Sequence, residues 1–204
     1  RAALSTLCEI YWRPLCAFLR YTGHGADEAE DLTQGFFEDL LRRGLFTRAD
    51  PQRGKMRTFL LQALKSWVGG ERRKRQTLKR GGEFQFIRIT DDADWLTFGE
   101  SRELSPDRYY DVQWAHALLT QSLKILREEF AAKDKGELFE SLRPWLSGEA
   151  DGELGEVSDR LGMTPGSVRV ALHRLRQRYR RLIRDLVADT MQPGERIEDE
   201  LRFL

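Results

Sequence analysis

The sequence predicts an all-α fold of two small helical domains, and three observations support this prediction. Apolar residues recur at helical spacing through most of the chain, as at Leu32, Phe36 and Leu40. Helix start and stop signals bound these segments, whereas an acidic stretch in mid-chain lacks helical periodicity. A length of 204 residues suffices for two small cores. We expect a first domain over residues 1–83, an irregular acidic linker over 84–104, a second domain over 105–191 and a tail over 192–204.

Composition predicts a cytoplasmic protein without a cofactor. No apolar run approaches the roughly 20 residues that span a bilayer, and the N-terminus lacks the pattern of a signal peptide. We therefore expect no contact with a membrane. Cys8 and Cys16 are spaced to fall near one helix face and are expected to be reduced core residues. His24, His116 and His173 lie far apart in the sequence, so we expect no metal site.

Charge is distributed unevenly along the chain, although the net charge is only +1. Basic residues concentrate at 65–80 and 169–184, whereas acidic residues concentrate at 27–39 and 91–111. Separation of this kind is typical of nucleic-acid binding through defined patches. It predicts two surfaces that contact phosphate and a separate surface for a protein partner.

Three helices are expected in the first domain. The first spans about residues 4–19, and Pro14 is expected to bend or break it at Arg13. The second covers 27–41 with an apolar band wider than one core face needs, so part of the band is available to a partner. The third begins near Met56 and ends in a basic run. Its Trp67 is interpreted as a core residue, slightly ahead of a surface on which a DNA base stacks.

Residues 155–184 have the signals of a helix-turn-helix. Gly162 is placed to end a first helix, Thr164 to cap a second one, and Pro165 to occupy its first position. Val168, Leu172, Leu175, Tyr179 and Leu182 form the apolar face of the second helix, and basic residues almost unbalanced by acids occupy the opposite face. A tight turn of this kind places a second helix in the major groove of DNA. The alternative is a solvated basic helix, which we consider the weaker interpretation.

Three further helices complete the prediction. Ser105 and Pro106 are a strong start for a long helix that runs to Phe130, and a shorter helix covers 138–146. A terminal helix over 197–204 is expected to dock on its own chain. A regulatory contact of this terminal helix is the less favoured alternative.

The order of these segments resembles the bacterial sigma-70 family of RNA polymerase sigma factors, of the extracytoplasmic-function type. The resemblance is carried by AEDLTQGFF at 29–37, MRTFLLQAL at 56–64, the basic run that follows, and the carboxy-terminal helix-turn-helix. It implies a promoter-specificity subunit, not an enzyme, that binds the clamp helices and flap of core RNA polymerase. Its first domain would melt the −10 promoter element, and its second would recognise the −35 element.

The resemblance also implies which residues make these contacts. Those matching the polymerase-binding helix are Asp31, Leu32, Gln34 and Phe37. Those expected at the −10 element are Arg53, Lys55, Arg57, Lys65, Ser66, Trp67, Arg72, Arg73 and Lys74. Those expected at the −35 element are Ser167, Arg169, Val170, His173, Arg174 and Arg176. Two positions depart from the family pattern, because Gly35 replaces a common Glu and Ser66 replaces a common Asn.

Two other functions fit parts of the sequence. A stand-alone helix-turn-helix regulator explains the basic residues after position 165 but leaves the patch at 65–80 without a role. A DNA recombinase is less favoured, because the first half lacks a constellation of acid, base and nucleophile. The expected partners are core RNA polymerase, promoter DNA, and an anti-sigma factor or another regulator.

Overall fold

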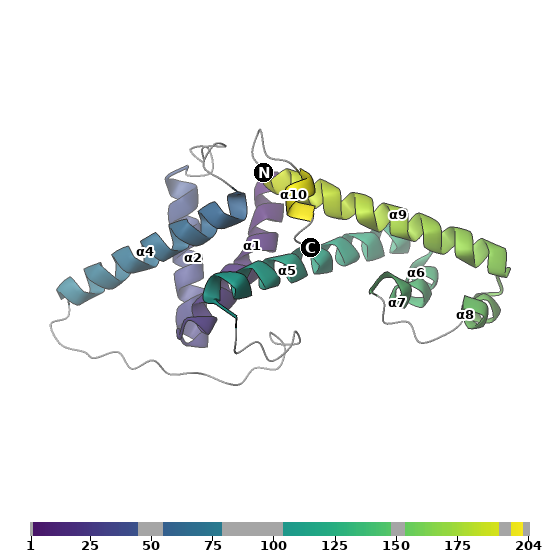
Figure 1. The fold of residues 1–204 in the computed structure, drawn as a ribbon, viewed down its shortest axis with the longest axis horizontal. Helices are drawn as coiled ribbons and strands as arrows, with labels where there is room; N and C mark the ends of the chain where they lie inside the picture. Colours follow the sequence, from purple (N-terminus) through teal and green to yellow (C-terminus); the bar gives the residue numbers. More distant parts are fainter. Residues whose placement is uncertain (1, 45–54, 79–103, 148–153, 192–196, 202–204) are drawn as a thin grey trace. The chain divides into compact units, whose positions relative to one another are not determined.

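A computed structural model describes residues 2–44, 55–78, 104–147, 154–191 and 197–201. Every regular element in these ranges is a helix (Figure 1), which confirms the all-α prediction. The helices are α1 (Ala2–Tyr21), α2 (Ala26–Arg42), α4 (Met56–Leu78), α5 (Pro106–Ala131), α6 (Gly136–Leu142), α7 (Pro144–Ser147), α8 (Leu154–Leu161), α9 (Pro165–Thr190) and α10 (Ile197–Leu201). Within the described ranges, none of these helices has the length and apolar character needed to cross a membrane.

The chain divides into two compact units, residues 1–117 with 189–204 as unit 1 and 118–188 as unit 2. This division differs from the expected domain boundaries, since the first turns of α5 belong to unit 1. The reason is aromatic packing: Tyr109 stacks on Tyr21 at 4.2 Å between ring centroids, and Tyr110 packs edge-on to Phe18 at 6.4 Å. The expected linker lies outside the described residues, apart from its last residue, Leu104.

Helices α1, α2 and α4 supply most of the core of unit 1. Leu15, Leu40, Leu60 and Leu64 are among its fully buried side chains. Helix α1 runs through Pro14 without interruption, so of the two expected outcomes, a bend or a break at Arg13, the break is wrong. A proline within a helix costs one backbone hydrogen bond, and burial of the surrounding helix face among apolar residues offsets that cost.

The two cysteines lie on α1 as free thiols. Cys16 is buried, as predicted, whereas Cys8 is only half-buried. Burial raises the pKa of the Cys16 thiol, with a smaller opposing effect of a hydrogen bond to Thr33. The thiol therefore stays protonated at neutral pH and behaves as a small apolar group.

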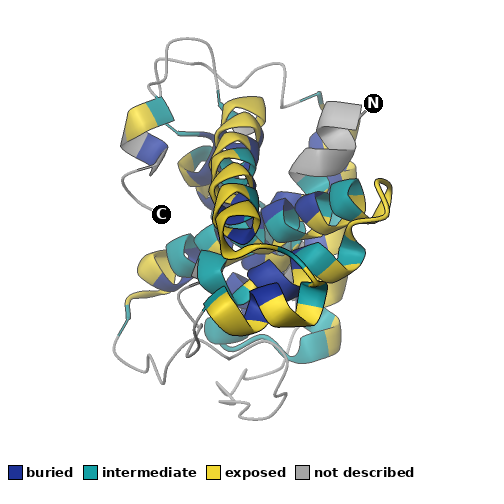
Figure 2. Cartoon of the chain, turned by 90° about the vertical axis from the view of Figure 1, so that its right-hand side faces the viewer, coloured by how far each residue is buried: buried dark blue, intermediate teal, exposed yellow. Residues whose placement is uncertain are grey.

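The core of unit 2 joins α5, α6, α8 and α9. Its buried members are Leu126, Phe139, Leu142, Val157, Val168, Leu172, Leu175 and Leu182, while Tyr179 is half-buried against them. The predicted apolar face of α9 is thus confirmed. The shorter helix expected over 138–146 is present as two pieces, α6 and α7, because Pro144 starts a new helix. In Figure 2 the exposed residues, in yellow, occupy the outer sides of these helices.

Candidate nucleic-acid interface and partner surface

The turn between α8 and α9 is closed by backbone hydrogen bonds. Gly162 has a φ of +61°, its amide donates to the Asp159 carbonyl, and the Met163 amide donates to the Ser158 carbonyl at 3.0 Å. These two bonds form the Schellman motif, which needs the left-handed conformation that glycine adopts without strain. The predicted stop signal is therefore confirmed at Gly162.

Helix α9 begins with the cap that the sequence predicts. The Ser167 amide donates to the Thr164 hydroxyl at 3.2 Å, and the hydroxyls of these two residues lie 2.8 Å apart. This cap satisfies one of the unpaired amides of the first turn. Together with the buried contacts of Val168 in the core of unit 2, it fixes the direction in which the first turns of α9 present their outer side chains.

All of the residues predicted to contact the −35 element are exposed. They are Ser167, Arg169, Val170, His173, Arg174 and Arg176. Val170 has 50% of its surface exposed, which is unusual for a large apolar side chain in the described part of the chain. Arg169, its neighbour in the chain, and Arg174, one helical turn later, are also exposed. An apolar side chain among hydrogen-bond donors has the chemistry for the methyl group of thymine, and the arginines have the chemistry for guanine and phosphate.

Arg176 and Arg178 of α9 contact other residues of unit 2. The Arg178 guanidinium donates to both carboxylate oxygens of Glu129 on α5, at 2.9 and 2.5 Å. The expectation that basic residues of α9 are almost unbalanced by acids before Asp185 is therefore wrong at Arg178. Arg176 is exposed, but its Nη2 donates to the Trp145 carbonyl at 3.1 Å. The remaining predicted cations, Arg169 and Arg174, make up the exposed basic face, which Arg180, Arg181 and Arg184 extend along the helix.

The residues predicted at the −10 element are in different environments. Ser66, Arg72 and Arg73 are exposed on α4, whereas Arg53 lies outside the described residues and the side chain of Lys74 is not described. The exposed residues form a polar, basic side of α4. The remaining members, Lys55, Arg57, Lys65 and Trp67, make contacts within unit 1.

Trp67 is half-buried and packs against α2. Its ring lies edge-on to Phe36 at 6.1 Å between centroids, and a Cβ atom at Gly35 would lie 3.0 Å from Trp67 Cη2. The small residue at position 35 therefore makes room for the indole. This contact gives a structural reason for a glycine at position 35, and it supports the interpretation of Trp67 as a packing residue.

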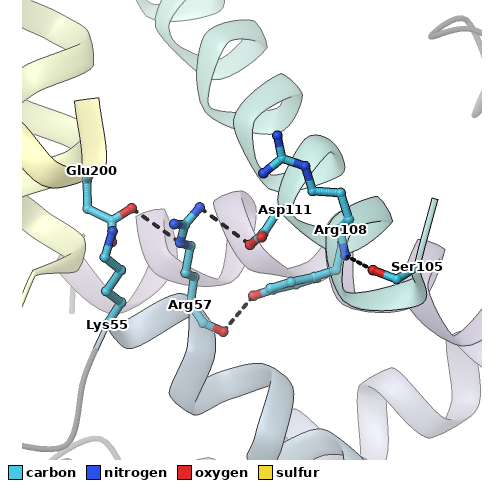
Figure 3. Close-up of polar contacts among 7 residues, drawn as sticks. Lys55, Arg57, Ser105, Arg108, Asp111 and Glu200 are labelled. Atoms are coloured by element: carbon cyan, nitrogen blue, oxygen red, sulfur yellow. Dashed lines mark hydrogen bonds and ion pairs between the residues drawn. The ribbon is translucent and has the colours of Figure 1, made fainter. Parts of the chain in front are cut away.

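Lys55, Arg57 and Lys65 are paired with carboxylates from distant parts of the chain. Arg57 Nε lies 3.3 Å from Glu200 Oε2, and Arg57 Nη1 lies 3.4 Å from Asp111 Oδ1 (Figure 3). Lys55 is 3.1 Å from Glu200, and Lys65 is 2.5 Å from Asp107. Sequence reasoning missed these pairs because the carboxylates belong to α5 and α10, far along the chain from α4.

Arg57 is held in place from several sides. Only 7% of its surface is exposed, its guanidinium carbon lies 4.9 Å from the centroid of the Trp114 ring, and its carbonyl accepts a hydrogen bond from the Tyr110 hydroxyl. Burial raises the pKa of the neighbouring Asp111 carboxyl, and the attraction of Arg57 opposes this shift. In this conformation Arg57 therefore lies in a charged cluster and does not face solvent.

The residues predicted to bind polymerase divide between the core and the surface of α2. Leu32 and Phe37 are 5% and 4% exposed, and the Phe37 ring stacks on Trp12 at 5.6 Å between centroids. Asp31 and Gln34 are exposed, and Gln34 donates a hydrogen bond to Glu38. In this conformation Leu32 and Phe37 support the helix, and only the polar members are accessible to a partner.

Leu41 is exposed on the outer face of α2, although the sequence pattern placed it in the apolar band of this helix. It is 44% exposed and lies one helical turn after Glu38. The helical spacing of Asp31, Gln34, Glu38 and Leu41 defines one accessible stripe. The sequence did indicate that part of this helix could be exposed, because its apolar band is wider than one core face requires.

Neither a metal site nor a known relative assigns a function to the surfaces described above. In the described ranges, no group of three or more His, Cys, Asp or Glu residues is placed to hold a metal ion. Comparisons with protein-family models, with curated proteins and with solved structures find no match.

Proposed function

We propose that this chain is a sigma-type promoter-specificity subunit, which binds core RNA polymerase, recognises two promoter elements and assists strand opening. The observation that carries the proposal is the exposed polar and basic face on the first turns of α9. That face follows a tight, capped turn from α8, which is the geometry expected of a helix-turn-helix. The proposal assigns the protein no catalysis of its own and places it in the cytoplasm with its DNA.

Each exposed residue of α9 has a distinct role in this proposal. Arg169 and Arg174 donate to guanine edges or phosphate, His173 adds a further polar contact, and Val170 packs on a thymine methyl. Ser167 lies at the helix start, where backbone amides favour a phosphate. Arg176, already bonded to a carbonyl, is assigned to phosphate positioning and not to base recognition.

The proposed surface for core polymerase is the accessible stripe of α2, which contains Asp31, Gln34, Glu38 and Leu41. An exposed leucine bordered by polar and acidic groups fits a helix-to-helix contact with a partner that carries basic residues. Leu32 and Phe37 act indirectly, since both are buried and Phe37 stacks on Trp12 of α1. Strand opening is assigned to the exposed side of α4, where Ser66, Arg72 and Arg73 lie.

Substitutions on α9 test the DNA-reading role. Arg169→Ala, His173→Ala and Arg174→Ala should each weaken binding to a selected promoter, and a lost bidentate base contact should cost about 1 to 3 kcal/mol at one base pair. Gln177→Ala, an exposed change on the same helix, is the matched control. Equal loss on every sequence by all three variants would refute base recognition by this face.

A stand-alone helix-turn-helix regulator remains a second candidate. It is favoured by the pairing of Arg57 and Lys65 with carboxylates, which reduces the basic surface of unit 1. Co-purification with core RNA polymerase separates the two candidates. Under the sigma-type proposal, Asp31→Lys with Leu41→Asp abolishes co-purification and leaves DNA binding by α9 intact. A chain that binds DNA but never retains polymerase would be a regulator.

A further inference from the structure

A buried carboxylate on α10 neutralises the cations at the start of α4. Glu200 is 5% exposed, and its carboxylate lies 3.1 Å from Lys55 and 3.3 Å from Arg57. All three residues belong to unit 1, and Figure 3 shows Glu200 directed from α10 toward the two basic side chains. The contact therefore joins the C-terminal segment to residues that the sequence predicts at the −10 element.

The ion pairs of Glu200 are contacts between α10 and the start of α4. The described part of the helix has five residues, Ile197–Leu201, and helices of this length are not stable in isolation. A carboxylate buried to this extent is unfavourable unless cations compensate it. Two cations surround Glu200, so the ion pairs contribute directly to holding α10 against α4.

The same side chains are chemically suited to a phosphate. Guanidinium and ammonium groups bind carboxylate and phosphate oxygens through the same charge-assisted contacts. While Glu200 contacts both cations, Arg57 is buried, and the charge of Lys55, whose side chain is 36% exposed, is already paired with a carboxylate. Asp111 on α5 adds a second carboxylate 3.4 Å from Arg57 Nη1. In this cluster the carboxylates of Glu200 and Asp111 occupy positions around Arg57 that the phosphates of a nucleic acid could take.

We propose that α10 is an autoinhibitory segment, in which Glu200 competes with single-stranded DNA for Lys55 and Arg57. This inference rests on the proposed function, since it takes the start of α4 to be part of the DNA-binding surface. In the closed form α10 lies on the cations and lowers DNA affinity. Binding of a DNA strand to Lys55 and Arg57 displaces Glu200 and releases α10. The apparent affinity is then reduced by the fraction of molecules that are closed.

The test measures binding of a fluorescein-labelled single-stranded DNA of mixed sequence by fluorescence anisotropy, using the full chain over a series of salt concentrations. Glu200→Gln should raise affinity about tenfold by increasing the open fraction. The slope of log affinity against log salt should become steeper by about 1.4, since two added phosphate contacts on a single strand contribute about 0.7 each. Glu198→Gln, which removes the same charge from an exposed position of α10, is the matched control and should have no comparable effect.

Two further variants keep the test decisive. Deletion of residues 197–204 should reproduce the gain if Glu200→Gln disturbs folding, which circular dichroism would report. Arg57→Gln combined with Glu200→Gln should show a smaller gain, with a slope steeper by about 0.7 and not 1.4, because one of the two released cations is then missing. Hydrogen exchange at 197–201 should accelerate when DNA is added to the unmodified chain.

The outcomes separate this proposal from the function on which it rests. Unchanged affinity in Glu200→Gln and in the deletion, together with weaker binding in Arg72→Glu, overturns autoinhibition and leaves the DNA-binding role of α4 in place. Absence of DNA binding by every variant overturns both. The inference is also refuted if Glu200→Gln still raises DNA affinity when both Arg57 and Lys55 are replaced by Gln. The gain in affinity would then not come from these two cations.

Discussion

At the residue scale, the glycine at position 35 leaves the space that the Trp67 indole occupies. A Cβ at Gly35 would approach Trp67 Cη2 to 3.0 Å, whereas a Cβ at Gly69 on α4 would meet nothing within 4 Å. Both glycines lie inside helices, where alanine is intrinsically preferred by about 1 kcal/mol. The structure thus distinguishes two substitutions that helix propensity alone would treat as equal.

We predict opposite effects of these substitutions on stability. Gly69→Ala should raise the free energy of unfolding by up to about 1 kcal/mol, because propensity improves without a clash. Gly35→Ala should lower it by about 1 to 2 kcal/mol, because the indole must move away from Phe36. Urea unfolding followed by tryptophan fluorescence measures both. A stabilising Gly35→Ala would show that Trp67 does not need the space.

Asp134 offers a second test at this scale. Its φ of +55° lies in the left-handed region, and the amide of Lys135 donates to the Phe130 carbonyl in the Schellman arrangement that ends α5. Glycine adopts this conformation without the cost of a Cβ. Asp134→Gly should therefore raise the free energy of unfolding by about 0.5 to 1 kcal/mol, and Asp134→Ala should lower it. Thermal unfolding of both variants measures the difference, and a destabilising glycine would contradict the assignment.

At the element scale, one ion pair connects α5 to the middle of α9. The hydrogen bond from Arg178 lowers the pKa of the Glu129 carboxyl below its ordinary value of 4.5, although partial burial opposes the shift. Because the pKa of Glu129 is lower in the folded state than in the unfolded state, the ion pair stabilises the protein at pH values above the unfolded-state pKa. That stabilisation is lost as the pH falls below 4.5 through the folded-state pKa.

This gives a prediction about acid unfolding. Glu129→Gln should lower the free energy of unfolding at pH 7 by about 1 kcal/mol, a magnitude limited by solvent screening of a partly exposed pair. The difference from the unmodified chain should shrink as the pH falls below 4.5. Glu128→Gln, an exposed neighbour on α5, is the matched control. A constant difference across this range would contradict the assigned ion pair.

Local signals explain which elements the sequence predicts well. The side-chain hydroxyls of Ser105 and Thr164 each accept a hydrogen bond from the backbone amide three residues later in the chain, as expected of helix caps. Gly162 ends α8 as predicted. These features depend on neighbours in the chain, so sequence alone suffices. Pro14 is different, because whether a helix tolerates a proline depends on how the whole helix packs.

At the scale of the whole molecule, the two units differ in how far the candidate site is predictable. On α9 the exposed face follows directly from helical periodicity, so every predicted −35 residue is accessible. In unit 1 the predicted cations Arg57 and Lys65 are paired with Asp111, Glu200 and Asp107. These partners come together only through tertiary folding. Charge along the sequence therefore overestimates the basic surface of unit 1.

We propose that the exposed faces of α4 and α9 contact two promoter elements at the same time while the chain is bound to one polymerase. Transcription reactions with core polymerase, with and without this chain, would first identify a promoter that depends on the chain. An insertion of about 5 bp between its two elements then rotates one element by half of a turn of about 10.5 bp. The chain alone could follow the displaced element, since a longer tether costs little entropy, whereas fixed positions on polymerase prevent this.

The deciding measurement is the permanganate reactivity of unpaired thymines in the downstream element of that promoter. Our account predicts reactive thymines only when polymerase and this chain are both present, and loss of that reactivity after the insertion. Thymines that open without the chain, or opening that is unaffected by the insertion, would contradict a two-element sigma factor.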